Sequence, residues 1–165
     1  MRIKTVGPWM KMNVVTISQD ATLKEAASRL AEKRVGTLPV VDTEGVMVGL
    51  ITMRDIVSFF LPDFIALVEN VNFVQDYGAL HEISGEDIQR ANLMQVKQIM
   101  GESMSIPEDC SLVRALSLMS LQVSPDLTVV RDGKPVGIVS SVDVGRAFFE
   151  TWLKEGRKTQ SPKKK

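Results

Sequence analysis

This sequence of 165 residues has little of what most metal sites and catalytic centres need. The single cysteine, Cys110, excludes an intramolecular disulfide and a multi-cysteine metal site, and we expect it to be a small apolar packing residue. The single histidine, His81, has no serine or cysteine motif beside it, so we predict no catalytic residues and no metal site. Because 20 basic residues balance 20 acidic ones, no net field attracts nucleic acid.

Long apolar runs and targeting signals are also lacking. The most apolar stretch, residues 56–62, is far shorter than the roughly 20 residues of a membrane-spanning helix, so we expect no membrane insertion. The first residues lack the apolar centre of a signal peptide, and a single cysteine suits a reducing compartment, so we expect a cytoplasmic protein. The basic residues 156–165 have no apolar periodicity and no aromatic platform, which predicts a flexible tail without nucleic-acid binding.

What the sequence does contain is one pattern that occurs twice. Residues 49–55 read GLITMRD, and residues 137–143 read GIVSSVD, 88 positions later. Each copy is a short apolar strand followed by a hydroxyl residue, two variable residues and an aspartate. The hydroxyl residues are Thr52 and Ser140, and the aspartates are Asp55 and Asp143.

The surroundings of the motif predict the same order of elements in both copies. In the first copy a strand at 14–17 precedes a helix that begins with a Thr22–Glu25 capping box. Strands at 38–41 and 46–52 then form a hairpin, and a second helix follows Thr52. In the second copy the first strand ends at residue 106, and two further strands cover residues 127–130 and 136–140. One helix begins at residue 111 and the other follows residue 140. The Asp132–Gly133 pair suits a tight hairpin turn, and Pro135 predicts a strand with a free edge.

Each copy therefore reads β-α-β-β-α, and about 50 residues bury too little surface to be stable alone. We predict an α/β (α+β) fold in which two pseudo-twofold-related repeats pack sheet to sheet and leave two clefts, a usual place for a ligand. The expected parts are the first repeat with an N-terminal segment (1–60), a helical connector (61–95), the second repeat (96–155) and the tail (156–165). In the connector, Asp63 and Ser84 are predicted helix caps, and the connector helices are expected to cover a core or to form a dimer or effector surface.

The two copies resemble a pair of cystathionine β-synthase (CBS) domains over residues 9–60 and 96–150. The first copy has both TLPVVD and GLITMRD, whereas the second has SPDLTVV in place of the usual LPVV stretch. Such a pair is similar to a Bateman module, which in this family senses AMP, ADP, ATP or S-adenosylmethionine and regulates a partner. The resemblance implies a regulatory adenosine ligand with no other cofactor, and a homodimer formed through the helices that carry Phe59, Phe60, Phe148 and Phe149.

Two interpretations of the hydroxyl and the aspartate stay open. Both motifs fit a capping box, which needs no ligand. Alternatively, the free amides and the hydroxyl could meet a phosphate, the carboxylate could accept hydrogen bonds from a ribose, and the neighbouring Ile51 and Val139 could face a base. In the family, the hydroxyl residue and the aspartate bind phosphate and ribose.

The resemblance further implies that each site takes residues from both repeats. The favoured site joins Val139, Ser140 and Asp143 to Val14, Val15, Val35, Gly36 and Thr37. The weaker site joins Ile51, Thr52, Arg54 and Asp55 to Ser103, Met104, Ser124 and Asp126. We expect the favoured site to fill first and to accept phosphorylated ligands, because Pro125 lacks an amide and Asp126 adds negative charge at the weaker one, which Arg54 can offset.

The leading hypothesis is a regulatory module that binds an adenosine-containing small molecule and acts on an unknown effector protein by changing the relative pose of the repeats. The alternative is a structural or protein-interaction module without nucleotide binding, in which both caps are only caps. A small hydrolase that uses Asp55 or Asp143 is disfavoured, because neither acid has a paired base or a metal ligand nearby in the sequence.

Overall fold

The structure, a computed structural model, describes residues 4–60, 84–102, 104–121 and 126–159. It divides into two compact units: unit 1 comprises Met1–Val14 and Met104–Lys165, and unit 2 comprises Val15–Ser103. The predicted helix at Asp63 lies outside the described residues. Within the ranges given above, no helix is long and apolar enough to cross a membrane.

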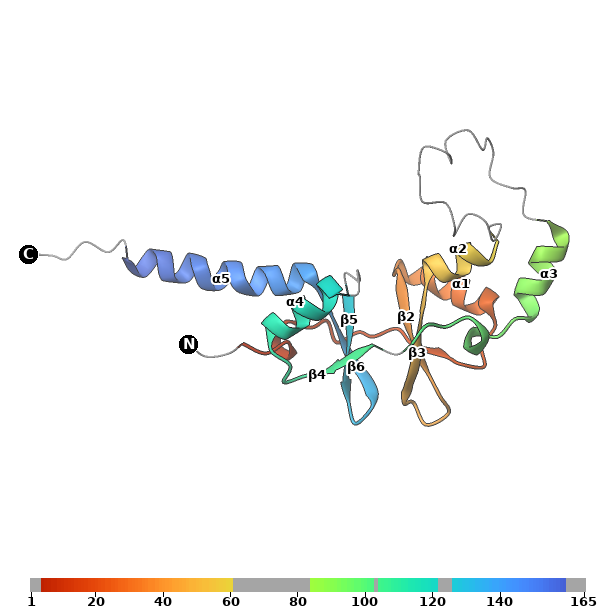
Figure 1. Cartoon of the computed structure of the whole chain (residues 1–165), viewed down its shortest axis with the longest axis horizontal. Helices are drawn as coiled ribbons and strands as arrows, with labels where there is room; N and C mark the ends of the chain where they lie inside the picture. The colour runs from red at the N-terminus through yellow and green to blue at the C-terminus, as the bar shows by residue number, and fades with distance from the viewer. Residues whose placement is uncertain (1–3, 61–83, 103, 122–125, 160–165) are drawn as a thin grey trace, which may run out of the picture. The chain divides into compact units, whose positions relative to one another are not determined.

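Unit 2 contains the first repeat. Its elements are β1 (Ile17–Ser18), α1 (Leu23–Lys33), β2 (Thr37–Val41), β3 (Met47–Thr52), α2 (Met53–Phe59), α3 (Gly85–Leu93) and the 3-10 helix η4 (Val96–Gln98) (Figure 1). The sheet has the order β1-β2-β3, with β1 parallel and β3 antiparallel to β2. The predicted capping box begins α1: Thr22 Oγ1 accepts from the Glu25 amide at 3.2 Å, and the Thr22 amide donates to Glu25 Oε2 at 2.7 Å.

Unit 1 contains the second repeat. Its elements are η1 (Gly7–Trp9), β4 (Ser105–Pro107), α4 (Leu112–Leu121), β5 (Asp126–Arg131), β6 (Lys134–Ser140) and α5 (Ser141–Thr159). The sheet order β4-β5-β6 repeats that of unit 2. Asp132 and Gly133 have φ angles of 52° and 75°, as a tight antiparallel turn requires. The β-α-β-β-α order is thus confirmed in both repeats, and Pro135 lies on an edge strand as predicted.

Each unit has its own hydrophobic core between its sheet and its helices. In unit 2, Leu23, Ala26 and Leu30 recur along one face of α1 and are buried, because helical spacing places them on the same side. In unit 1, Leu112, Ala115 and Met119 do the same for α4. Cys110 is buried in this core, as expected, and burial raises the pKa of its thiol.

Each of these cores also contains residues from a short segment that precedes the repeat of the other unit. The N-terminal arm, residues 4–11, precedes the first repeat but belongs to unit 1, where Val6 is fully buried. The middle arm, residues 94–101, precedes the second repeat but belongs to unit 2, where Val96 is fully buried. The expected boundaries instead group residues 1–14 with the first repeat and residues 96–101 with the second.

The two arms make equivalent backbone hydrogen bonds. In unit 1 the amides of Leu112, Val6 and Gly7 donate to Lys4, Cys110 and Glu108, and in unit 2 the amides of Leu23, Val96 and Lys97 donate to Met94, Ala21 and Gln19. Each arm ends in a one-residue antiparallel bridge to the edge strand of its sheet, Lys11 to Ile138 and Gly101 to Leu50. The duplication therefore includes the arms, although their pairing partners lie far away in the sequence.

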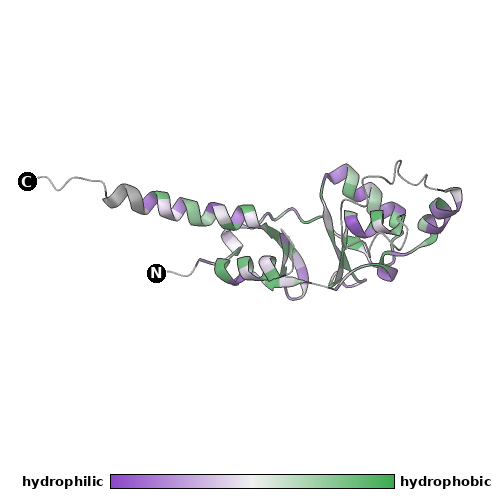
Figure 2. Ribbon diagram, turned by 45° about the horizontal axis from the view of Figure 1, so that its top comes forward, coloured by the Kyte–Doolittle hydropathy of each residue, from purple (hydrophilic) through white to green (hydrophobic). Residues whose placement is uncertain are grey.

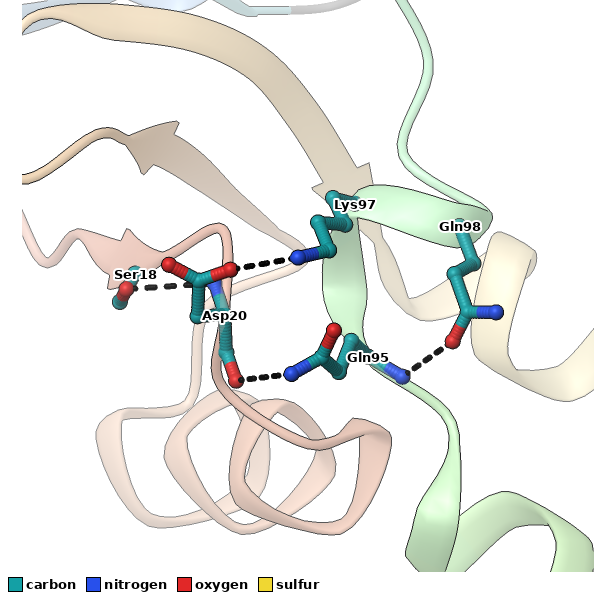
Figure 3. A network of polar contacts seen from close by, with 5 residues as sticks. All are labelled: Ser18, Asp20, Gln95, Lys97 and Gln98. Atoms are coloured by element: carbon teal, nitrogen blue, oxygen red, sulfur yellow. Dashed lines mark hydrogen bonds and ion pairs between the residues drawn. The ribbon is translucent and has the colours of Figure 1, made fainter.

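A polar network holds the middle arm against the loop between β1 and α1 (Figure 3). The Lys97 ammonium lies 2.7 Å from Asp20 Oδ1, and Gln95 Nε2 donates to the Asp20 carbonyl at 3.4 Å. The Gln95 amide in turn donates to Gln98 Oε1 at 2.8 Å. This network fixes the arm of unit 2 from its solvent-exposed side, while Val96 fixes it from the core.

Candidate functional site

Both hydroxyl–aspartate motifs form capping boxes where an edge strand passes into a helix. Thr52 Oγ1 accepts from the Asp55 amide at 3.2 Å, while Thr52 Oγ1 and the Thr52 amide donate to Asp55 Oδ2 at 2.8 and 2.7 Å. Ser140 and Asp143 make the same three contacts at 3.2, 2.6 and 2.9 Å, again through Oδ2. The two copies therefore agree in geometry as well as in sequence.

A capping box alone does not identify a ligand site. Thr22–Glu25 is a full capping box in the same unit as Thr52, and Ser84 at the start of α3 accepts from the Asp87 amide at 3.1 Å. Asp55 and Asp143 differ from Glu25 in being partly buried at the end of an edge strand, and in the described ranges no donor binds their Oδ1 atoms, as is also true of Glu25 Oε1. A carboxylate oxygen of this kind can accept hydrogen bonds from a ribose while the cap stays intact.

The ends of the central strands lie directly across from these caps. Thr37, the first residue of β2, is the register partner of Thr52, and the Met53 amide donates to the Gly36 carbonyl at 2.9 Å. Asp126, the first residue of β5, is the register partner of Ser140. Paired residues on neighbouring antiparallel strands project from the same face of the sheet. Each unit thus brings Thr37 or Asp126 next to its own hydroxyl residue, whereas the resemblance groups each of them with the hydroxyl residue of the other repeat.

The two apolar residues expected to face a base are core residues instead. Ile51 and Val139 have no exposed surface and belong to the hydrophobic clusters of units 2 and 1. Side chains alternate between the two faces of a strand, so a residue beside Thr52 or Ser140 points to the helix-covered face. This corrects the expectation for Ile51 and Val139, and any apolar contact to a base must come from other residues.

A cation and two carboxylates meet at the cap of unit 1. The Lys11 ammonium lies 3.9 Å from Asp143 Oδ2, and the Asp143 side chain is only 14% exposed. Burial raises the pKa of the half-buried Asp126 carboxyl, Lys11 lowers it, and the negative charge of Asp143 raises it. Asp126, expected to add negative charge at the Asp55 site, therefore interacts with Asp143.

The remaining predicted site residues have varied environments. Val15 and Val35 are partly buried against the core of unit 2, and Met104 against that of unit 1. Val14 is partly buried at the end of the unit 1 segment, and Arg54 is exposed on α2. Ser103, Ser124 and His81 lie outside the described residues, and the part of the chain that is described contains no group of three histidine, cysteine or acidic residues able to hold a metal ion.

Lys11 was not predicted from the sequence as a neighbour of the cap. A signal was present, because residues 6–10 and 96–100 both read Val-x-x-x-Met at the start of the two arms. Met10 and Met100 lie against Gly137 and Gly49, the first residues of the repeated motif. This match would have extended the repeat toward the N-terminus and placed residue 11 beside the second copy.

Two β-α-β-β-α repeats, each with a polar cap at the end of an edge strand, define a tandem-repeat module with duplicated candidate sites. The family model for the CBS domain matches residues 3–62 and 96–150. The chain belongs to the CBS domain family. An uncharacterized protein of Acidianus ambivalens is 27% identical over 139 residues, which are 83% of this chain and 68% of that protein. An uncharacterized Methanopyrus kandleri protein is 33% identical over 60 residues, which are 36% of this chain and only 30% of that protein.

Solved structures show the same fold. The structure of CBSX2 in complex with AMP has a TM-score of 0.65 at 24% identity and covers 89% of this chain and 97% of its own. The CBS domain pair of protein MJ0100, in complex with 5-methylthioadenosine and S-adenosyl-L-methionine, has a TM-score of 0.63 at 24% identity and covers 90% and 98%. Each of these two structural relatives thus binds adenosine-containing compounds.

Proposed function

We propose that this chain is a regulatory module that binds an adenosine-containing ligand, AMP, ADP, ATP or S-adenosylmethionine, and transmits binding to a partner protein. The observation that carries the proposal is the pair of partly buried caps, Thr52–Asp55 and Ser140–Asp143, each at the end of an edge strand and each with one carboxylate oxygen that no donor of the described residues binds. The ligands of the structural relatives contain a ribose, whose two hydroxyls are donors of the required kind.

The path of the chain suggests how a ligand could act. The chain passes between the units after Val14 and again before Met104, and Val14, Val15 and Met104 are among the predicted ligand contacts. A ligand that contacts these residues would act on the segments that link the units. Such a ligand changes the population of two poses only by binding one of them more tightly.

Calorimetry with AMP, ATP and S-adenosylmethionine on Asp143→Ala and Asp55→Ala tests the proposal. Loss of a charge-assisted hydrogen bond should weaken binding by about 1.5 to 3 kcal/mol, or roughly ten- to a hundredfold. Glu25→Ala is the matched control, because it removes the same N3 carboxylate from the capping box of α1. The proposal fails if no adenosine compound binds, or if the folded double variant binds as tightly as the wild-type protein.

The alternative, an interaction module without nucleotide binding, is favoured by one observation. Along the exposed face of α5, Val142, Phe149, Trp152 and Leu153 are 60% to 75% exposed, and apolar and polar residues alternate on this helix in Figure 2. We propose that this face joins two copies of the chain. Phe59 and Phe60, expected in the same role, are instead partly buried against the core of unit 2 with their ring centres 5.2 Å apart.

A further inference from the structure

Lys11 has a backbone held by two hydrogen bonds and an exposed side chain. Its amide donates to the Ile138 carbonyl at 2.8 Å, and its carbonyl accepts from the Ile138 amide at 2.9 Å. Ile138 lies two residues before Ser140 on β6, so this bridge holds Lys11 beside the cap. The side chain itself is 71% exposed, and its ammonium reaches to 3.9 Å from Asp143 Oδ2. A ligand that binds at this cap would therefore meet the Lys11 ammonium.

The charge of Lys11 offsets two carboxylates that face the same place. Asp143 lies in the first turn of α5, and Asp126 lies opposite Ser140 at the start of β5. After burial, which raises the pKa of Asp126 most, Lys11 lowers this pKa and the negative charge of Asp143 raises it. A ligand phosphate at this cap would meet the negative charges of Asp126 and Asp143, and the positive charge of Lys11 opposes them.

Unit 2 provides an internal comparison. At the equivalent positions it has Thr37 opposite Thr52 in place of Asp126, and Gly101 bridged to Leu50 in place of Lys11. Thr37 is neutral, and Gly101 has no side chain. At these two positions unit 1 has an acid, Asp126, and a cation, Lys11, whereas unit 2 has neither. This joint presence indicates that the charge of Lys11 offsets the charge of Asp126.

We propose that Lys11 determines which ligand charge the Ser140–Asp143 cap accepts, by neutralising Asp126 and Asp143 and contacting the phosphate of an adenosine ligand. The inference rests on the proposed function, because it assigns a ligand class to one of its two caps. The sequence alone attributed the preference of this site for phosphorylated ligands to the negative charge that Asp126 was expected to add at the other site. In this proposal the preference instead comes from Lys11, which offsets the acids near Ser140.

The test compares three ligands that share adenosine and differ in charge: AMP, adenosine and S-adenosylmethionine. Calorimetry is carried out on the full chain and on Lys11→Met, which keeps the length of the side chain and the backbone bridge. We expect Lys11→Met to lower the affinity for AMP relative to adenosine by about three- to tenfold, since the contact is partly exposed to solvent. Binding of S-adenosylmethionine, which carries a positive sulfonium, should be unchanged or tighter.

Salt and two further variants sharpen the comparison. Raising NaCl from about 50 mM to about 500 mM should reduce the AMP-to-adenosine affinity ratio of the wild-type protein and increase that of Lys11→Met, because attraction is screened in one and repulsion in the other. Lys11→Arg should keep the preference for AMP. Asp126→Thr, which copies the residue of unit 2, should make AMP binding depend less on Lys11. Lys97→Met is the control, since Lys97 lies on the middle arm and pairs with Asp20 in the loop between β1 and α1.

The possible failures are distinguishable. If the wild-type protein binds none of the three ligands, or if Asp143→Ala binds them unchanged, the proposed function fails at this cap and the inference fails with it. If the wild-type protein binds them and Lys11→Met weakens all three equally, Lys11 only holds the N-terminal arm. That result would overturn the inference and leave the proposed function standing.

Discussion

The contact between each arm and the first glycine of the repeated motif allows a quantitative prediction. A Cβ atom built on Gly137 would overlap Met10 Sδ and lie 2.8 Å from Met10 Cγ. A Cβ atom built on Gly49 would lie 2.6 Å from Met100 Sδ and 2.9 Å from the carbonyl oxygen of Gly101. All these distances are well inside normal van der Waals contact, so alanine at either position requires the neighbouring side chain or the arm itself to shift.

The two substitutions should differ in severity because different atoms obstruct them. Met10 has a flexible side chain that can turn away, so we expect Gly137→Ala to lower the free energy of unfolding by about 1 to 2 kcal/mol. The Gly101 carbonyl cannot turn away, because it accepts the Leu50 amide at 3.1 Å. We therefore expect Gly49→Ala to cost about 2 to 3 kcal/mol, the upper part of the usual range for overpacking.

Urea unfolding followed by circular dichroism measures both effects, and double variants assign their cause. Adding Met10→Ala to Gly137→Ala should recover about 1 to 2 kcal/mol relative to the sum of the single changes. Adding Met100→Ala to Gly49→Ala should recover less, because the carbonyl obstruction remains. Gly145→Ala in α5 is the control, since no atom lies within 4 Å of its Cβ position and alanine should stabilise that helix by about 0.5 to 1 kcal/mol. Wild-type stability in Gly137→Ala and Gly49→Ala would refute the close packing of the arms.

Three further predictions concern charge and association. The pKa of Asp126 is raised in the folded state, so its contribution to stability is present below its unfolded-state pKa and is lost as the pH rises through the folded-state pKa. Asp126→Asn should therefore be more stable than the wild-type protein at about pH 7. Urea unfolding should show that this advantage disappears toward about pH 4. Lys97→Met and Asp20→Ala should each cost less than about 1 kcal/mol, since both partners are almost half exposed, and thermal melts in high salt should show a smaller effect. Phe149→Lys should convert a dimer into a monomer in sedimentation at tens of micromolar, whereas a monomeric wild-type protein would contradict the role given to α5.

The elements that the sequence predicts well are those fixed by neighbouring residues. The capping box at Thr22, the turn at Asp132–Gly133 and the hairpin strands depend on contacts within a few positions, and all are present. The first strand is shorter than predicted: β1 begins at Ile17, because residues 14–16 belong to the segment where the chain enters unit 2. Periodicity detects an apolar run but not the point at which it begins to pair.

The candidate site was predicted less completely, because part of it depends on contacts between residues that are far apart in the sequence. The capping boxes of Thr52–Asp55 and Ser140–Asp143 were predictable because each pair is local, and the structure confirms their capping contacts. The surroundings of the caps come from distant pairings that leave little trace in the sequence, such as the single bridge from Lys11 to Ile138. Side chains alternate between the two faces of a strand, so Ile51 lies on the face opposite to Thr52, and here that face is the core.

The exchange of arms has a consequence for both stability and regulation. Unit 2 needs Val96 in its core, and unit 1 needs Val6, although each residue precedes the repeat of the other unit. A fragment limited to residues 15–60 would therefore lack part of its own core, so the repeats are not expected to fold separately. The same exchange leads the chain past the cap of unit 1 at Lys11, three residues before it leaves that unit after Val14. A ligand that holds Lys11 at Asp143 would thus fix one end of a segment that joins the units, which gives it a direct way to favour one pose over another.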